Sequence, residues 1–297
     1  MTIKKIKWKG LFKKRYLLGF LLLVYLLFAH SCMTMRSSSK KTKHYFESKG
    51  VDYIDATVHV NGHNIHYIQT GRKDAQTLVF IHGSPGAWSA WQGYLSEERF
   101  VKEYRVIAPD RPGFGFSDFR KSLNLSDQAA LLNNFLKGLS NGKPVTLIGH
   151  SYGGPLIVKM ALDDPNGYDN LVILAGALDP DAEKKERWRK PLTWFPLKYL
   201  VPGALKPSND ELWMLKQDLI DLKPELQQLK EKVFIIHGTN DKLVPYSNVP
   251  FMEKEFVNVD SLEVTTLENE RHFIVWDREA LIKEKLLNIT KYFPLQP

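Results

Sequence analysis

A serine flanked by glycines lies at residues 149–153, where the sequence reads Gly-His-Ser-Tyr-Gly. A short apolar run, residues 145–148, precedes this pattern, and a helix-compatible stretch, residues 156–162, follows it. This order predicts a strand, a sharp turn and a helix, with Ser151 at the apex of the turn. The glycines keep side chains from colliding at the strained turn, so the hydroxyl is exposed at the carboxyl end of a sheet. The amide N–H of Tyr152 then points to where an oxyanion would form.

Two later loops supply the base and the acid that a serine nucleophile needs. His272 follows an expected strand at residues 262–266, and Asp241 follows another at residues 232–236. A serine hydroxyl is a weak nucleophile until an adjacent base accepts its proton. The imidazole of His272 would take this proton and later deliver it to the leaving group, while the carboxylate of Asp241 would fix the imidazole tautomer. We therefore predict that Ser151, Asp241 and His272 form a catalytic triad.

Strand and helix patterns alternate through the body of the chain. The pair Asn61-Gly62 joins two strand-like runs, which is a strong hairpin signal. A helical pattern spans residues 126–139, with Ser126 as its expected N-cap. The expected strands cover residues 56–60, 64–69, 77–81, 104–108, 145–148, 171–174, 232–236 and 262–266. This alternation predicts an α/β fold, in which a mostly parallel, eight-stranded sheet has helices on both faces.

Residues 178–231 interrupt the alternation with several prolines and two amphipathic helical patterns but no strand-like run. Because the segment lies between two sheet strands, we expect a helical lid, inserted after strand 6, above the carboxyl ends of the strands. Aromatic side chains in such a lid would shape an apolar substrate pocket, or would only pack the lid onto the body. The candidate pocket residues are His82, Trp188, Trp194, Phe195 and Trp213.

Positive charge is concentrated at the N-terminus. The 297-residue chain has a formal net charge of +8, but residues 1–49 contain 12 Lys or Arg and one acid, and the remaining 248 residues contain 29 Lys or Arg and 32 Asp or Glu. The body is therefore slightly acidic, and we exclude nucleic acid as a partner. The length suits one large α/β domain, which we place at residues 51–297.

The leader, residues 1–32, has the layout of a signal or membrane-anchor segment. An acid-free basic region precedes a run of 14 uncharged residues, 16–29, and the sole cysteine, Cys32, follows this run. A run of this length suits the apolar region of a signal peptide better than a spanning helix, which needs about 20 residues. Cys32 resembles the lipidation site of bacterial lipoproteins. Lipid anchoring, an uncleaved signal anchor and a cleaved signal peptide all remain open.

All three fates of the leader export the body from the cytoplasm. We expect a membrane-associated protein of the bacterial cell envelope, attached through its N-terminal segment and possible lipidation at Cys32. Residues 33–50, which are rich in Ser and Lys, are expected to form a solvated tether.

Residues 56–293 resemble the α/β-hydrolase fold superfamily, in the lid-bearing branch with esterases, epoxide hydrolases, haloalkane dehalogenases and proline iminopeptidases. The resemblance rests on four ordered motifs, followed by His272: residues 82–86, 110–117, 149–154 and 241–245. It implies that the amides of Ser84 and Tyr152 form the oxyanion hole and that residues 110–117 form a structural turn. Asp179 occupies the place where some relatives keep their catalytic acid.

The resemblance also implies a reaction class. Epoxide hydrolases and dehalogenases use Asp as nucleophile, so a serine at position 151 argues against both chemistries. We expect a serine hydrolase that cleaves a small or medium carboxylic ester through an acyl-enzyme on Ser151, with a small-molecule acyl substrate. No metal and no cofactor are expected, because neither clustered Cys and His ligands nor a phosphate-binding loop occurs. The acyl and leaving-group preferences and the oligomeric state stay open.

Two other functions remain possible on the same fold. One is an aminopeptidase or amidase of the proline iminopeptidase type, in which lid carboxylates bind a free amino terminus. The carboxylates available in the expected lid are Asp210, Glu211, Asp218, Asp221 and Glu225. Charges on a helix more often form a solvated face. The other function is a non-catalytic binding protein with a silent triad.

Overall fold

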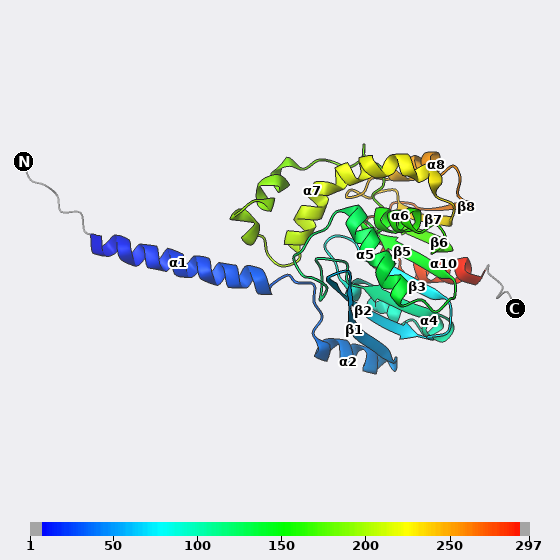
Figure 1. Ribbon diagram of the computed structural model, residues 1–297, viewed down its shortest axis with the longest axis horizontal. Helices are drawn as coiled ribbons and strands as arrows, with labels where there is room; N and C mark the ends of the chain where they lie inside the picture. Colours follow the sequence, from blue (N-terminus) through cyan, green and yellow to red (C-terminus); the bar gives the residue numbers. More distant parts are fainter. Residues whose placement is uncertain (1–7, 292–297) are drawn as a thin grey trace, which may run out of the picture.

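A single eight-stranded sheet forms the centre of the protein in the computed structural model, which describes residues 8–291 (Figure 1). The strands are β1 (Tyr53–Val60), β2 (His63–Gly71), β3 (Thr77–Ile81), β4 (Arg105–Pro109), β5 (Val145–His150), β6 (Asn170–Leu174), β7 (Lys232–Gly238) and β8 (Ser261–Leu267). Their order in the sheet is β1-β2-β4-β3-β5-β6-β7-β8. The pairs β1–β2 and β2–β4 are antiparallel, and the other five pairs are parallel. The predicted mostly parallel, eight-stranded sheet is confirmed.

Helices cover both faces of the sheet, which explains why its central strands are continuous apolar runs. Every residue of β3, β4 and β6 is buried. One face packs against α5 (Leu125–Gly138), α6 (Gly153–Asp163) and α8 (Asn248–Glu255). The other face packs against η1 (Trp88–Trp91), α3 (Gln92–Leu95), α4 (Glu98–Glu103), α9 (Ile274–Asp277) and α10 (Glu279–Lys291). Because β3 to β8 all run in the same direction, their carboxyl ends share one edge, where loops can meet.

The N-cap of α5 differs from the prediction. Helix α5 begins at Leu125, and the side chain of Asn124 accepts a hydrogen bond from the amide of Asp127 at 2.8 Å. Ser126 lies inside the first turn. Asn and Ser are similarly good caps, so the composition of this stretch could not distinguish the two positions.

Residues 178–231 connect β6 to β7 and are called the excursion below. They contain η2 (Arg187–Thr193), η3 (Leu197–Tyr199), α7 (Leu205–Leu222) and η4 (Lys223–Gln228), and no strand. In Figure 1 they arch over the upper left of the sheet, with η2 and η3 projecting away from the body. The excursion thus departs from the edge at which the carboxyl ends of the parallel strands lie and ends at the opposite edge, where β7 begins.

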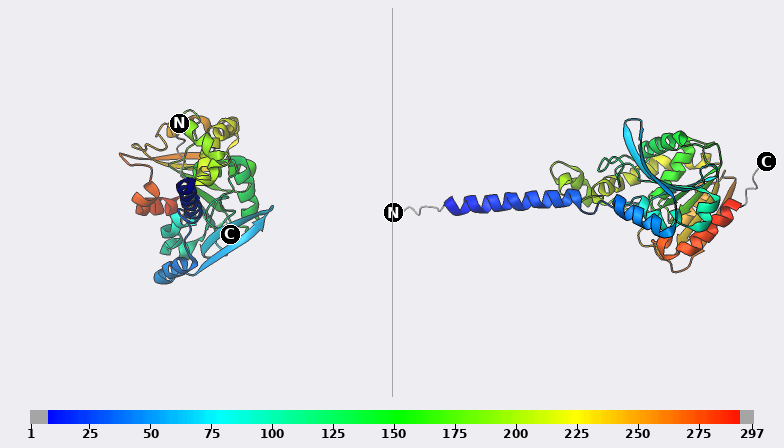
Figure 2. Two further views of the ribbon diagram at one scale, coloured as in Figure 1. Left: turned by 90° about the vertical axis from the view of Figure 1, so that its left-hand side faces the viewer. Right: turned by 90° about the horizontal axis from the view of Figure 1, so that it is seen from below.

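The leader forms helix α1 (Trp8–Ser31), which is 24 residues long. A 19-residue part, Lys13–Ser31, is long and apolar enough to cross a membrane by length and composition, and only 6% of it is buried. A signal peptide passes the same test. Figures 1 and 2 show α1 projecting away from the body on the side of η2 and η3. The helix extends beyond the 14-residue run that we identified, because the flanking Lys, Arg and Ser residues continue it.

Residues 33–50 are not a solvated tether throughout. Helix α2 (Ser39–Lys49) begins at an N-cap, Ser38, and ends at Gly50 in the left-handed conformation. Phe46 is fully buried and stacks between Tyr53 and Trp88, with ring centroids 4.7 and 6.1 Å away. Our prediction is wrong for this part, because one aromatic side chain docks α2 onto the sheet despite a polar surrounding sequence.

Candidate active site

Ser151 lies between β5 and α6 in a backbone conformation that is rare for residues other than glycine. Its φ angle is +55°, and its amide donates a hydrogen bond to the carbonyl of Leu174 at 3.0 Å. A side chain at Gly149 would collide with the carbonyl of Gly153, and one at Gly153 would collide with the carbonyl of Ile81. The two glycines thus permit the sharp turn that presents the half-buried Ser151 at the carboxyl edge of the sheet.

His272 and Asp241 are joined across two loops at the same edge. The Nδ1–H of His272 donates to Oδ2 of Asp241 at 2.7 Å, which leaves Nε2 as the unprotonated ring nitrogen. The second carboxylate oxygen accepts hydrogen bonds from the amides of Leu243 at 2.9 Å and Val244 at 2.8 Å. Burial raises the pKa of the Asp241 carboxyl, but these donors more than offset burial and hold the pKa below its usual value. Asp241 is therefore an anion that orients His272.

The loop after β3 faces the turn that carries Ser151. A Cβ at Gly83 would lie 3.0 Å from the Cβ of Ser151, so a side chain there would crowd the serine. Within residues 8–291, the amides of Ser84 and Tyr152 donate to no acceptor. Buried or half-buried amides without a partner are unusual, and two of them beside a serine can bind an oxyanion.

Two buried histidines surround the pair of His272 and Asp241 without replacing either residue. His150 donates from Nε2 to the carbonyl of His272 at 3.1 Å, and burial lowers the pKa of His150 to about 3. His237 donates from Nε2 to the carbonyl of Val244 at 2.9 Å, and burial also lowers the pKa of His237. Both rings are therefore neutral supports of the two loops.

A buried ion pair joins the excursion to this edge of the sheet. Arg111 and Glu211 are 0% and 1% exposed, and the guanidinium binds the carboxylate through two hydrogen bonds of 2.8 Å. Gln128 bridges the pair: its carbonyl oxygen accepts from Arg111 at 2.7 Å, and its amide donates to Glu211 at 3.1 Å. Bidentate pairing of this kind fixes geometry as well as charge.

The same arginine holds both parts of the expected oxyanion hole. It donates to the carbonyls of His82 at 2.9 Å and Gly83 at 3.0 Å, next to Ser84. Its guanidinium also lies over the ring of Tyr152, 4.5 Å from the centroid. We did not identify Arg111 from the sequence. The available signal was its position in the 110–117 motif, which we interpreted only as a turn.

The candidate pocket residues lie in different environments. His82 is fully buried, donates from Nδ1 to Gly83 and accepts from the amide of Arg111 at Nε2. Our assignment of His82 to the pocket wall is wrong, because both ring nitrogens are used inside the loop. Trp188, Trp194 and Phe195 are exposed to solvent. Trp213 is half-buried under Lys185, whose ammonium lies 5.0 Å from the ring centroid.

Carboxylates outside the Asp241–His272 pair are engaged elsewhere. Asp110 accepts hydrogen bonds from the amides of Trp88 and Phe116 and from His66. Asp179, the alternative acid, accepts from the amide of Asp181 at 2.8 Å. The carboxylates of α7 and η4 bind nearby groups as follows: Asp210 contacts Lys206 and Ser122, Glu211 contacts Arg111, Asp218 contacts the amide of Leu125, Asp221 contacts Gln217, and Glu225 contacts Lys159.

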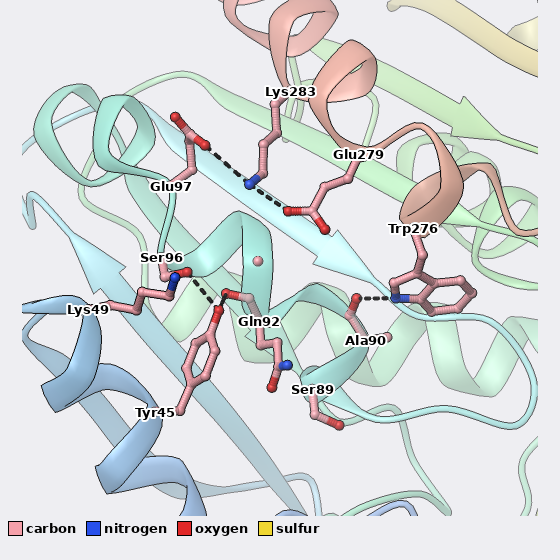
Figure 3. Close-up of a pocket in the computed structure, with 11 residues that line it drawn as sticks. Tyr45, Lys49, Ser89, Ala90, Gln92, Ser96, Glu97, Trp276, Glu279 and Lys283 are labelled. Atoms are coloured by element: carbon pink, nitrogen blue, oxygen red, sulfur yellow. Dashed lines mark hydrogen bonds and ion pairs between the residues drawn. The ribbon is translucent and has the colours of Figure 1, made fainter.

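Two cavities of the body lie away from these residues. One of about 350 Å³ lies between α2, α3 and α10, and Figure 3 shows its polar lining, with Lys283 between Glu97 and Glu279. Another of about 370 Å³ lies at the opposite, amino edge of the sheet. Neither is lined by Ser151, Asp241 or His272. Within residues 8–291, no three His, Cys, Asp or Glu side chains are close enough to hold a metal ion.

Known proteins resemble this chain in sequence and in fold. The sequence model of the alpha/beta hydrolase fold family matches residues 76–200. Epoxide hydrolase 1 of Caenorhabditis elegans is 31% identical over 111 residues, which is 36% of this chain and 27% of that protein. The aligned part thus spans about a quarter of that relative.

Solved structures match over much more of the chain. A putative lipase from Acinetobacter baumannii has a TM-score of 0.63 at 18% identity, over 86% of this chain and 97% of the lipase chain. A membrane phospholipase A, described as a bacterial virulence factor, has a TM-score of 0.62 at 20% identity, over 94% and 98% of the two chains. This protein therefore has the α/β-hydrolase fold.

Proposed function

We propose that this protein is a serine hydrolase that cleaves carboxylic esters. The observation that carries the proposal is the 2.7 Å hydrogen bond between His272 and Asp241, on loops at the sheet edge where Ser151 is presented. It prepares Nε2 of His272 to act as a base. The two amides without acceptors, at Ser84 and Tyr152, supply the second requirement of acyl transfer, a site for the oxyanion.

The reaction then proceeds in two halves. Oγ of Ser151 attacks the ester carbonyl while its proton moves to Nε2 of His272, and the amides of Ser84 and Tyr152 hold the oxyanion. The proton passes to the alkoxide oxygen, the carbon–oxygen bond breaks, and the alcohol leaves. His272 next takes a proton from water, which attacks the acyl group. The tetrahedral intermediate collapses, Ser151 regains its proton, and the carboxylic acid is released.

Ester cleavage fits this chain better than the activity in the name of its epoxide hydrolase relative. That relative is similar over 36% of this chain, and position 151 carries a serine where epoxide hydrolases use an aspartate. A serine can form an acyl intermediate that water hydrolyses at the carbonyl. The lipase and phospholipase structures, which share the fold at 20% identity or less, bear names consistent with this chemistry.

Recognition of a free amino terminus has less support. Glu211 is the most buried carboxylate of the excursion, and its two oxygens bind Arg111. A carboxylate already neutralised by a guanidinium attracts a substrate ammonium only weakly. The other carboxylates of α7 and η4 also have partners within the chain.

We further propose that the chain is exported and held at a membrane by its N-terminal segment. The basic residues that precede the apolar part of α1 favour an orientation with the N-terminus in the cytoplasm and the body outside. Extraction of cell membranes with alkaline carbonate tests this: the full chain should remain in the pellet. The intact mass of the protein from this pellet then identifies the state of Cys32.

A substrate panel tests the reaction class. The full chain in detergent should hydrolyse p-nitrophenyl esters of acetate to octanoate, and a Ser151→Ala variant should not. Styrene oxide and the p-nitroanilides of proline and alanine should react much more slowly. Faster cleavage of the aminoacyl anilides would contradict the ester assignment, and epoxide opening that survives Ser151→Ala would contradict the serine mechanism.

A further inference from the structure

One segment of the excursion, residues 184–199, exposes an unusual concentration of large apolar side chains. Phe195 is 78% exposed, and Trp188 and Trp194 are each more than half exposed. Leu197 and Tyr199 are also exposed, so five such side chains lie within 12 residues. Elsewhere in the body, exposed large hydrophobic residues are scattered along the chain. A contiguous exposed apolar patch marks an interaction site.

Basic residues are interleaved with these aromatic rings. The segment contains six Lys or Arg and one acid, Glu186. Arg189 lies 4.4 Å from the ring centroid of Trp188, Lys190 lies 5.8 Å from that of Trp194, and Lys198 lies 5.3 Å from that of Tyr199. Trp and Tyr favour the interface between lipid and water, while Lys and Arg favour anionic headgroups. The pattern therefore fits a lipid surface better than an acidic protein, which would not need the exposed rings.

The segment lies next to the membrane-anchor helix. The hydroxyl of Tyr25 donates to the carbonyl of Leu200 at 2.5 Å, and the amide of Gly203 donates to the carbonyl of Ala29 at 2.6 Å. Tyr25 is six residues before the end of α1, which is about 9 Å along a helix. Figure 2 shows the same proximity, with η2 and η3 beside the last turns of α1. The segment is thus level with the final part of the apolar span.

We propose that residues 184–199 dock into the headgroup region of the bilayer that holds the N-terminal segment, with anionic lipids as their partner. The aromatic rings enter the interface, and the ammonium and guanidinium groups bind lipid phosphates. Both anchoring modes expected from the sequence place the bilayer here. Helix α1 ends beside the segment, and a lipid on Cys32 would begin beside Gly203, since a Cβ at Gly203 would meet the Cys32 carbonyl.

Docking also defines the substrate class, a consequence that rests on the proposed ester hydrolysis. The excursion connects the docked segment directly to α7, and Ser208 of α7 accepts a hydrogen bond from Ser84 at 2.8 Å. A site approached from the bilayer surface receives amphiphiles. The ester is then the acyl ester of a membrane lipid and not of a freely soluble alcohol.

A single-cysteine probe tests the docking without any need for catalysis. In a Cys32→Ser background the chain has no other cysteine, so Phe195→Cys and Val257→Cys can each carry one environment-sensitive NBD label. Val257 is the matched control, because it is 61% exposed and precedes β8 at the amino edge of the sheet. The full chain is placed in nanodiscs of phosphatidylcholine, with or without phosphatidylglycerol.

We expect the label at 195 to emit at shorter wavelength than the label at 257. It should also be quenched several-fold less by iodide and strongly quenched by lipids with a nitroxide near the headgroup. These effects should be largest with phosphatidylglycerol, and Lys184→Gln with Lys185→Gln and Lys190→Gln should remove that dependence. Equal iodide quenching at 195 and 257 would overturn the docking. If the label at 195 is shielded from iodide but is not quenched by the nitroxide lipids, the surface binds a second protein copy and the membrane proposal is wrong. If its shielding from iodide does not depend on phosphatidylglycerol, the proposal of an anionic lipid partner is wrong.

The proposed hydrolysis can fail separately. A chain whose label at 195 contacts lipid but whose Ser151 does not react with an acylating probe docks on membranes without being a hydrolase. If Ser151 reacts with the probe but the label at 195 is exposed to water, the proposed hydrolysis is supported and the proposed docking is contradicted.

Discussion

Asp241 is an anion in the folded protein because three donors converge on its buried carboxylate. Two amides bind one oxygen, and Nδ1–H of His272 binds the other. Burial raises the pKa of this carboxyl, whereas the donors lower it further than burial raises it. The carboxylate is therefore ionised over the whole neutral range, and it is the group that selects the tautomer of His272 with a free Nε2.

Replacement of Asp241 should separate tautomer control from simple loss of structure. Asp241→Asn keeps the shape of the side chain but no longer accepts from Nδ1–H in the required way, so kcat for ester hydrolysis should fall about 10³–10⁴-fold. Asp179→Asn is the matched control. The Asp179 carboxylate accepts a hydrogen bond from the amide of Asp181, so this substitution should leave kcat unchanged. A large loss of kcat in Asp179→Asn with a small loss in Asp241→Asn would show that Asp179, and not Asp241, is the catalytic acid.

The candidate site residues could be predicted where one local pattern contains them. Ser151 lies in a glycine turn after an apolar run, and Asp241 and His272 each follow a strand. Arg111 and Glu211 are 100 positions apart in the sequence, and no periodicity joins them. Glu211 also lies on an amphipathic helix, where a charged residue usually faces water. Only the packing of α7 on the loop after β3 shows that this carboxylate is buried.

At the scale of elements, the pair of Arg111 and Glu211 fixes α7 against the loop that supplies the Ser84 amide. Glu211→Gln leaves a buried guanidinium without its counter-charge, which should lower the free energy of unfolding by about 3–5 kcal/mol. The measurement is thermal and urea unfolding of the full chain in detergent. Asp210→Asn, one position away and partly exposed, should cost less than about 1 kcal/mol. Equal effects of the two changes would show that the buried pair does not hold α7.

A second carboxylate of α7 makes stability depend on pH. Burial raises the pKa of Asp218 from 3.8 to about 6, although the amide of Leu125 donates to the carboxylate. The native state then binds more protons than the unfolded state between these values, so the free energy of unfolding falls as pH rises from about 4 to about 6.

Asp218→Asn should remove this loss of stability and keep an acceptor for the amide of Leu125. We expect the variant to match the wild type near pH 4 and to exceed it at pH 7 by about 1 kcal/mol after solvent screening. Urea unfolding of the detergent-solubilised chain at both pH values checks the difference. A variant that is less stable than the wild type at pH 7 would contradict the raised pKa.

The sequence predicts the strands well because their central residues are buried on both faces. The run 77–81 coincides with β3, and the edge strand β1 begins three residues before the predicted 56–60. The predictions are wrong mainly where a single contact determines the local structure. The N-cap of α5 is Asn124, and α2 is held to the sheet chiefly by the burial of Phe46. Such contacts depend on residues distant in the sequence, so local patterns do not contain them.

At the scale of the whole molecule, the anchor, the aromatic segment and the site follow one another along one side. Residues 187–199 adjoin the end of α1, and α7 connects them to the loop of Ser84 (Figure 1). The sequence contains both the leader and the aromatic residues, but their proximity is visible only in the structure. The sequence predicts that these rings line a pocket, because composition does not show which way an aromatic side chain faces.

This arrangement predicts a preference for substrates that partition into bilayers. The full chain in anionic nanodiscs should hydrolyse a long-chain fluorogenic ester held in the bilayer, and Phe195→Asp should reduce this rate several-fold more than the rate on soluble p-nitrophenyl acetate. Val257→Asp, at an exposed position away from the membrane, should change neither rate. A Phe195→Asp effect that is equal on both substrates would contradict delivery from the bilayer.

The central claim is that Ser151 is an activated nucleophile, and the mass of the intact chain tests it most directly. The detergent-solubilised full chain and its Ser151→Ala variant are treated with a fluorophosphonate and compared by mass spectrometry, with circular dichroism to establish that both are folded. The account predicts one adduct on the wild type and none on the variant. A folded wild-type chain without an adduct, or an adduct retained in Ser151→Ala, would contradict it.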